Sequence, residues 1–183
     1  MRLLILLLCI VFLISVIFLG LSYSSPFLMS NSKSSQTIQN ASLYFKPSTV
    51  YSSCRNSTET VEIYLNSGTN SATGAQIELT YNPSIASNVT IIPSQNNFFG
   101  KAADFSVALN EMRSEYGRVS YAVNKTKQLD TKGNKSLALL TFTLNATASN
   151  SSRISFLNKS AVYSNSSRAS ILENTVPLLI QCE

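Results

Sequence analysis

Few residue types that perform enzyme chemistry occur in this sequence. The 183 residues include no histidine, the side chain that most often acts as a general base or a metal ligand. A histidine-dependent catalytic triad is therefore excluded. Glu111 and Glu115 are close enough in sequence to suggest a pair for glycoside hydrolysis. Both lie in a polar stretch beside Arg113, so we interpret them as solvated surface charges and predict that the protein is not an enzyme.

Motifs for cofactors and metals are also missing from the sequence. No glycine-rich phosphate loop joins a strand to a helix, and the cysteines form no cluster that could hold zinc. Asp104 and Asp130 stand alone, without the alternating aspartates of a calcium loop. We predict no cofactor and no metal.

Sugar recognition needs aromatic rings on an exposed face, because pyranose rings stack on them. The chain has no Trp and eight Tyr. The alternation of apolar and polar residues directs Tyr81 and Tyr121 inward and Tyr64 outward. Tyr64 is the candidate ligand-binding residue, with an ordinary surface tyrosine as the alternative.

Asn-x-Ser/Thr triplets are frequent, with first residues Asn40, Asn56, Asn88, Asn124, Asn134, Asn145, Asn150, Asn158 and Asn165. In a host with N-glycosylation they are acceptor sites, and in other hosts they are polar turns. The candidates are Asn56, Asn88, Asn124, Asn145 and Asn158.

The formal net charge of +5 is spread along the chain. Its densest basic stretch, residues 125–135, contains Thr, Asp, Gly and Asn but no aromatic residue. This composition is typical of a solvated loop, and we predict no nucleic-acid partner.

The N-terminus predicts export. Residues 3–21 carry no charge and follow Arg2, which is typical of a transmembrane anchor or a cleaved signal peptide. Either segment places the rest of the chain outside the cytoplasm, membrane-anchored or secreted. Residues 22–40 are rich in Ser, Asn and Gln and predict a flexible linker. A single domain is expected over residues 41–183.

The cysteines agree with an oxidising compartment. Cys9 lies within the apolar run, which leaves Cys54 and Cys182. Two distant cysteines in an exported domain are most simply a disulfide, and two unrelated thiols are the alternative.

The pattern after residue 41 is strand after strand, with apolar and polar residues alternating between turns rich in Gly, Pro, Asn and Ser. It predicts an all-β sandwich, with strands over residues 59–68, 74–83, 87–94, 104–112, 117–124, 136–146, 152–158 and 175–182. Residues 101–112 also admit a helix, but no convincing apolar stripe supports it. Asn82-Pro83 predicts an Asx-type turn after the second of these strands.

The expected inward side chains follow from the same alternation. They are Val61, Ile63, Leu65, Ile77, Leu79, Tyr81, Phe105, Val107, Leu109, Val119, Tyr121, Val123, Leu140, Phe142, Leu144, Ile154, Phe156, Val176, Leu178 and Ile180.

Four segments, in order, resemble cohesin-like domains. "GAQIELTYNPSI" (residues 74–85) is similar to a cohesin strand that ends in Tyr-Asp-Pro, and "VEIYLNSG" (61–68) to the strand before it. "GRVSYAV" (117–123) and "LALLTFTLNA" (137–146) resemble two later strands. The resemblance spans roughly Leu43 to Ile180. Asn82 replaces the usual Asp, and Cys54 stands where a Gly-Asp pair is common.

The resemblance implies a jelly-roll β-sandwich of about nine strands, whose first and last strands are parallel neighbours. Cys54 and Cys182 would then lie at the same end of that pair. Cohesin-like domains bind dockerin modules in cellulose-degrading assemblies or act as sugar-binding and display modules. We therefore expect a non-catalytic extracellular binding module that recognises a polysaccharide or a dockerin-like protein. The alternative is a structural subunit of a cell envelope or surface layer.

Overall fold

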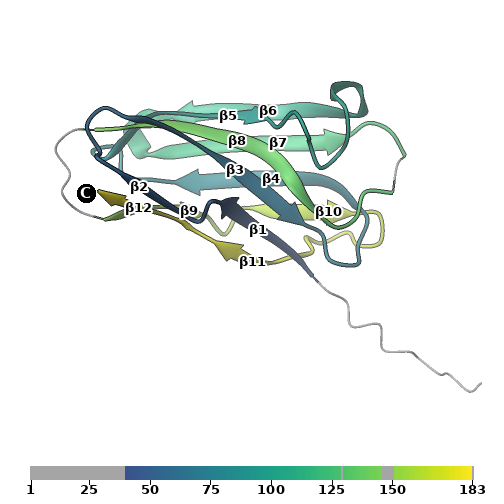
Figure 1. The fold of residues 1–183 in the computed structure, drawn as a ribbon. Helices are drawn as coiled ribbons and strands as arrows, with labels where there is room; N and C mark the ends of the chain where they lie inside the picture. Colours follow the sequence, from purple (N-terminus) through teal and green to yellow (C-terminus); the bar gives the residue numbers. More distant parts are fainter. Residues whose placement is uncertain (1–39, 129, 146–150, 183) are drawn as a thin grey trace, which may run out of the picture. The chain divides into compact units, whose positions relative to one another are not determined.

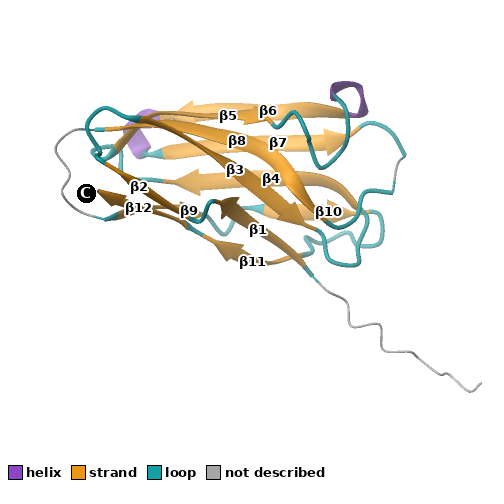
Figure 2. Cartoon of the chain, in the orientation of Figure 1, coloured by secondary structure: helices purple, strands orange, loops and turns teal. Residues whose placement is uncertain are grey.

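A computed structural model describes residues 40–128, 130–145 and 151–182. This part of the chain forms twelve strands and two single 3₁₀ turns (Figures 1 and 2). The strands are β1 (Ala41–Lys46), β2 (Thr49–Ser52), β3 (Thr58–Asn66), β4 (Ala72–Thr80), β5 (Ala86–Pro93), β6 (Phe105–Arg113), β7 (Arg118–Lys125), β8 (Asn134–Leu144), β9 (Ser152–Phe156), β10 (Ala161–Ser164), β11 (Leu172–Val176) and β12 (Leu178–Cys182). The turns are η1 (Ala102–Asp104) and η2 (Ser114–Tyr116).

The strands form two sheets packed face to face. The five-stranded sheet has the order β11-β1-β3-β8-β5. The seven-stranded sheet has the order β2-β12-β9-β4-β7-β6, with β10 also paired to β4. The predicted all-β sandwich is confirmed.

Two of the strands beyond the nine expected arise because both terminal strands are interrupted by proline, which has no N–H for a sheet ladder. At Pro47 the chain passes from β1 in the five-stranded sheet to β2 in the seven-stranded sheet. At Pro177 it passes in the same way from β11 to β12. Because β1 pairs with β11 and β2 with β12, both in parallel, the expected parallel pairing of the first and last strands is confirmed.

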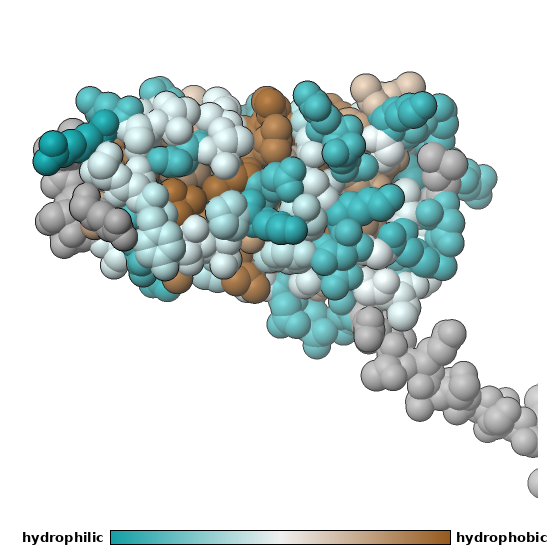
Figure 3. Space-filling view, in the orientation of Figure 1, coloured by the Kyte–Doolittle hydropathy of each residue, from teal (hydrophilic) through white to brown (hydrophobic). Residues whose placement is uncertain are grey.

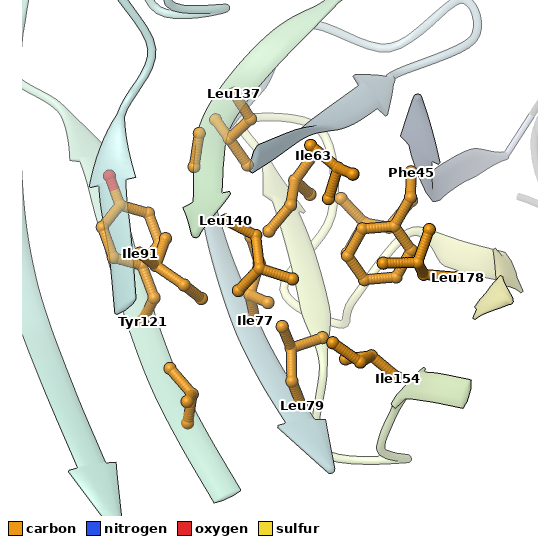
Figure 4. Close-up of a cluster of buried hydrophobic side chains, with 14 of the residues drawn as sticks. Phe45, Ile63, Ile77, Leu79, Ile91, Tyr121, Leu137, Leu140, Ile154 and Leu178 are labelled. Carbon is orange, nitrogen blue, oxygen red and sulfur yellow. The ribbon is translucent and has the colours of Figure 1, made fainter. Parts of the chain in front are cut away.

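The core fills the space between the sheets (Figure 4). Phe45, Ile63 and Leu140 from the five-stranded sheet point toward Ile77 and Leu79 from the seven-stranded sheet. Most of the side chains predicted to face inward are buried, among them Val61, Leu65, Tyr81, Val119, Val123, Phe142, Leu144, Ile154 and Ile180. Strict alternation in a half-buried strand is thus sufficient to identify these residues.

Two inward predictions are wrong. Val107 is 41% exposed and Val176 is 47% exposed. Val107 lies in β6, the edge strand of its sheet, where a register irregularity between Val107 and Leu109 disturbs the alternation. Val176 lies in β11, also an edge strand, and Pro177 moves the next residues to the other sheet. An alternation read through Pro177 therefore assigns Val176 to the wrong side.

The predicted turn after β4 is confirmed. The Asn82 side-chain Oδ1 accepts a hydrogen bond from the Ser84 N–H at 3.0 Å, which defines an Asx turn. The Asn82 backbone oxygen accepts the N–H groups of Ile85 and Ala86, each at 3.0 Å. Asn82 therefore has a structural reason to be present.

Tyr121 makes stability depend on pH in the alkaline range. Its side chain is buried, its hydroxyl has no hydrogen-bond partner among the described residues, and burial raises its pKa from 10.0 to about 12. The unfolded chain loses this proton near the lower of these two pKa values, 10.0, and the folded chain near the higher, about 12. The free energy of unfolding therefore falls as the pH rises through the window between them.

We expect this loss to reach about 2–3 kcal/mol at the upper end of the window. Tyr121→Phe, which has no proton to lose, should not show it. Urea unfolding of both proteins from about pH 9 to pH 12 measures the difference, because other groups titrate alike in the two proteins. An identical pH dependence would contradict the assignment.

The predicted anchor or signal segment, residues 1–21, and most of the predicted linker lie outside the described residues. Within the described residues, no helix is long and apolar enough to cross a membrane.

Candidate binding surfaces

The carboxylates considered for catalysis lie at the surface. Glu111 is on edge strand β6, and its Oε2 is 3.5 Å from a guanidinium nitrogen of Arg113, with both side chains more than half exposed. Glu115 lies in η2 and is also exposed. In the described part of the chain, no three His, Cys, Asp or Glu side chains are grouped as metal ligands would be. The features with binding geometry are instead the outer faces of the two sheets.

Tyr64 lies on the outer face of the five-stranded sheet as half of an aromatic pair. Its partner, Tyr44, is directly opposite on β1, and the ring centroids are 5.5 Å apart with 28° between the planes. The Lys46 ammonium is 5.2 Å from the Tyr64 ring centroid, within range of a cation–π interaction. A hydrogen bond to Glu62 raises the pKa of the Tyr64 hydroxyl. Tyr64 is thus ordered by its neighbours, and its role in ligand binding stays a prediction.

Beside Tyr64 the surface is hollowed. We call this feature the amide hollow, and it is lined by Glu62, Tyr64, Gln95, Asn96, Asn97, Gly100, Lys101, Asp104, Asn134, Lys135 and Ser136. These residues come from β3, from the start of β8 and from the loop of residues 94–104 between β5 and β6. Of the predicted site residues, only Tyr64 lines it.

The loop of residues 94–104 is fastened to the sandwich. The buried Asn97 donates from its side-chain amide to the Leu137 backbone oxygen and accepts the Phe99 N–H. Phe98 and Phe99 are buried and meet edge to face, with ring centroids 5.2 Å apart. This wall of the hollow is therefore held in place before any ligand arrives.

Asp104 fixes the same loop to its neighbour. Its Oδ1 is 2.6 Å from the Lys127 ammonium, and its Oδ2 accepts the Lys101 N–H at 2.9 Å. The hydrogen bond from Lys127, followed by that from the Lys101 backbone, lowers the pKa of Asp104. The carboxylate thus stays ionised and links the 94–104 loop to the loop after β7.

The outer face of the seven-stranded sheet carries a hydrogen-bonded network, centred on Glu78 of β4. Gln76 Nε2 donates to Glu78 Oε1 at 3.0 Å, and the Ser120 hydroxyl donates to Glu78 Oε2 at 2.6 Å. Ser120 lies directly opposite Glu78 on β7. Both carboxylate oxygens are therefore held in fixed positions on this face.

Small residues and arginines surround the network. Ala122 on β7 pairs with Gln76. Gly74 lies between Asn124 on β7 and Tyr163 on β10. Toward one end, Arg113 and Arg118 are cross-strand neighbours. We call the outward side of β4, β6 and β7 the β4–β7 face. Protein interfaces are enriched in arginine and depleted in lysine relative to other surfaces.

The two cysteines predicted to pair are joined in the structure. Cys54 follows β2 and Cys182 ends β12, and β2 and β12 are parallel neighbours. Their Cα atoms are 5.4 Å apart, within the range for a disulfide. The bond links residues 128 positions apart, so it closes almost the whole domain into one loop.

The candidate glycosylation residues differ in their surroundings. Asn56 and Asn88 are exposed and have positive φ values of 53° and 50°, a conformation in which asparagine is enriched. Asn124 and Asn158 are exposed, on β7 and in the turn after β9. Asn145 donates its amide to the backbone oxygens of Pro83 and Ser84 at 3.4 Å and 3.3 Å. A sugar on that nitrogen would remove one donor. Glycosylation at all five asparagines remains a prediction.

Comparison with known proteins identifies the fold. No family model and no curated protein matches the sequence. The cohesin CaCohA2 of Clostridium acetobutylicum, in a complex with a variant of CaDoc0917, matches with a TM-score of 0.62 and 16% identity, over 78% of this chain and 99% of that chain.

Two further complexes that contain a cohesin also match the fold of this chain. The third ScaC cohesin of Acetivibrio cellulolyticus, bound to a ScaB dockerin, matches with a TM-score of 0.60 and 14% identity, over 77% of this chain and 97% of that chain. The OlpA cohesin of Clostridium thermocellum, in complex with Doc918, matches with a TM-score of 0.60 and 9% identity, over 78% of this chain and 98% of that chain. The described sandwich thus has the cohesin fold, as the resemblance implied.

Proposed function

We propose that this protein is a non-catalytic recognition module that binds a dockerin-like protein through its β4–β7 face. The observation that carries the proposal is the match of the sandwich to nearly the full length of cohesin domains whose structures were determined with dockerins. Because likeness of fold alone does not establish function, the face must also have the properties of an interface.

The β4–β7 face has those properties. The small side chain of Ala122 lies among its outward residues, which leaves room for a partner to approach the backbone there. Glu78 already has its two partners, so binding would not need to order it. Arg113, Arg118 and the 66% exposed Tyr116 gather at one end. Arginine and tyrosine are the residues that most often supply binding energy at protein interfaces.

An arginine at the centre of this face should abolish docking. Ala122→Arg places a long charged side chain where a partner needs close approach, and we expect it to weaken binding at least about 100-fold. The matched control is Thr141→Arg on the outer face of the five-stranded sheet, which should bind as the unchanged protein does. Dockerin-type modules encoded in the same genome are the probes, and calorimetry measures their affinity for the full-length chain.

Two results would contradict this proposal. One is the absence of binding to every dockerin-type module at micromolar concentration. The other is an equal effect of Ala122→Arg and Thr141→Arg. If the protein instead self-associates as its concentration rises, in the absence of any partner, the envelope-subunit alternative is favoured.

Recognition of a polysaccharide is a second and separate proposal. It is favoured by the stacked Tyr44–Tyr64 pair beside the amide hollow, since aromatic rings with nearby amides suit the apolar faces and hydroxyls of sugars. The two proposals use opposite sheets and can be tested independently.

The setting that we propose for both is extracytoplasmic. The Cys54–Cys182 disulfide supports it, because disulfides persist in oxidising compartments and are rare in the cytosol. Attachment to a membrane through residues 3–21 also remains a proposal.

A further inference from the structure

The amide hollow offers hydrogen-bonding groups on all its walls. Gln95 and Asn96 are exposed on the loop side, and Asn134 is exposed at the start of β8. Each primary amide supplies donors and an acceptor, although the Asn134 Oδ1 already accepts a hydrogen bond from the Tyr44 hydroxyl at 2.7 Å. A ligand rich in hydroxyl groups could be held by several of them at once.

Ser136 adds a group that needs a partner. The residue lines the hollow and is only 5% exposed, and its Oγ has no hydrogen-bond partner among the described residues. Buried polar groups are ordinarily hydrogen-bonded, because leaving a buried donor or acceptor without a partner is unfavourable. Ser136 is directly opposite Tyr64 on the neighbouring strand. The unpartnered hydroxyl therefore lies beside the aromatic pair, where a ligand hydroxyl could bond to it.

The charges in the hollow select the type of ligand. Among the acids, Asp104 is paired with Lys127 outside the hollow, and Glu62 interacts with the Tyr64 hydroxyl and has Lys46 opposite it on β1. Lys101 and Lys135 also line the hollow, and both are exposed. Neither forms an ion pair within the described ranges. The Lys101 charge helps to lower the pKa of the Asp104 carboxyl, but both lysine side chains are exposed and accessible to an anionic ligand.

Next to the hollow the outer face has some apolar character, because Leu139 is the cross-strand neighbour of Glu62. Figure 3, in which the five-stranded sheet lies in front, shows apolar residues gathered in a short band within a mostly polar face. Ile92 and Leu139, cross-strand neighbours on this outer face, are half exposed and partly buried respectively. A ligand longer than one residue would have both polar and apolar surface to cover.

We propose that the amide hollow binds an acidic saccharide, one that carries carboxylate or sulfate groups. Lys101 and Lys135 would bind its anionic groups, Ser136 and the amides its hydroxyls, and Tyr64 the apolar face or edge of a sugar ring. This proposal specifies the class of polysaccharide and rests on the polysaccharide proposal above. It is independent of the proposal that the chain binds a dockerin-like protein.

The test is calorimetric titration of the full-length chain, produced in a host without N-glycosylation so that Asn134 is unmodified. The probes are a tetramer of galacturonic acid, a heparin tetrasaccharide and the neutral cellotetraose. We expect an acidic sugar to bind at least about tenfold more tightly than cellotetraose, because hydrogen bonds to charged groups are stronger than those to neutral groups. Binding of the galacturonic acid tetramer would show that carboxylates are sufficient. Binding of the heparin tetrasaccharide alone, which carries both groups, would show that sulfate is required.

Three variants examine the hollow itself. Lys101→Gln and Lys135→Gln should each weaken binding of the acidic sugar about tenfold and leave any cellotetraose binding unchanged. Ser136→Ala should weaken all sugar binding without lowering thermal stability, because its hydroxyl has no internal bond to lose. The matched control is Lys132→Gln, an exposed lysine that pairs with Asp130 and does not line the hollow.

The outcomes separate the two levels of the proposal. Equal affinity for acidic and neutral sugars would overturn the acidic class but support polysaccharide binding. No binding of any probe at millimolar concentration would overturn both. If Lys132→Gln weakens binding as much as Lys101→Gln, attraction to the general positive charge is the cause and the hollow is not the site. Ala122→Arg should bind the sugars normally.

Discussion

Removal of the Cys54–Cys182 disulfide is expected to lower the free energy of unfolding by about 4–5 kcal/mol. The bond spans 128 positions, and in the chain-entropy model a loop of that length restricts the unfolded chain by this amount at 25 °C. Domains are commonly stable by only about 5–15 kcal/mol. The double variant Cys54→Ala/Cys182→Ala should therefore be close to unfolding at 37 °C.

Denaturant unfolding of the oxidised protein, the reduced protein and the double variant measures this effect. The reduced protein should match the double variant, and a reductant should change the variant no further. A loss below about 1 kcal/mol would contradict the expectation, because it would mean that the interrupted terminal strands hold together without the bond.

The second large effect is expected at Gly117, which joins η2 to β7. Its φ is 59°, and it lies against the turn after β4, where its backbone oxygen accepts the Tyr81 N–H at 2.9 Å. A Cβ at this position would collide with the Tyr81 backbone oxygen and would also lie 3.1 Å from Cδ of Pro83. We expect Gly117→Ala to lower the free energy of unfolding by more than about 3 kcal/mol.

Gly133 is the matched control. It has a φ of 100°, and a Cβ there would meet no atom within 4 Å. Gly133→Ala should therefore cost only the strain of its backbone conformation, about 1 kcal/mol. Urea unfolding of the two variants isolates the collision at Tyr81. Similar losses in both would show that the two turns are not packed together as described.

Much of the sandwich could be predicted because alternation is a local property. In β3, β4, β7 and β8 the apolar residues recur at every second position, and strand geometry alone directs them to one face. The same reasoning fails in β6 and β11, since an edge strand can expose both faces and its surroundings depend on which strands pair beside it. Val107 and Val176 follow the expected alternation, but each lies on an edge strand where the side predicted to face inward is exposed.

The candidate binding surfaces were much less predictable. Tyr64 could be assigned outward from its strand, but nothing in the local sequence connects it with Lys101, Lys135 or Ser136. Residues 94–104 lie between two predicted strands, and the buried Phe98 and Phe99 that anchor this loop follow no strand or helix period. The sequence feature nearest to an indication of this surface is the run of amides at Gln95, Asn96 and Asn97, which by itself predicts only a polar turn.

The secondary structure class, most of the buried side chains, the Asn82 turn and the absence of histidine chemistry could all be established from the sequence. Each of these depends on residue type and on neighbours within a few positions. Only the fold shows that Glu78 contacts Ser120 on the neighbouring strand, and that Tyr64, Lys101 and Ser136 line one hollow. The physical reason is that strand pairing is non-local, so the sheet order brings together residues whose separation in sequence gives no sign of their contact.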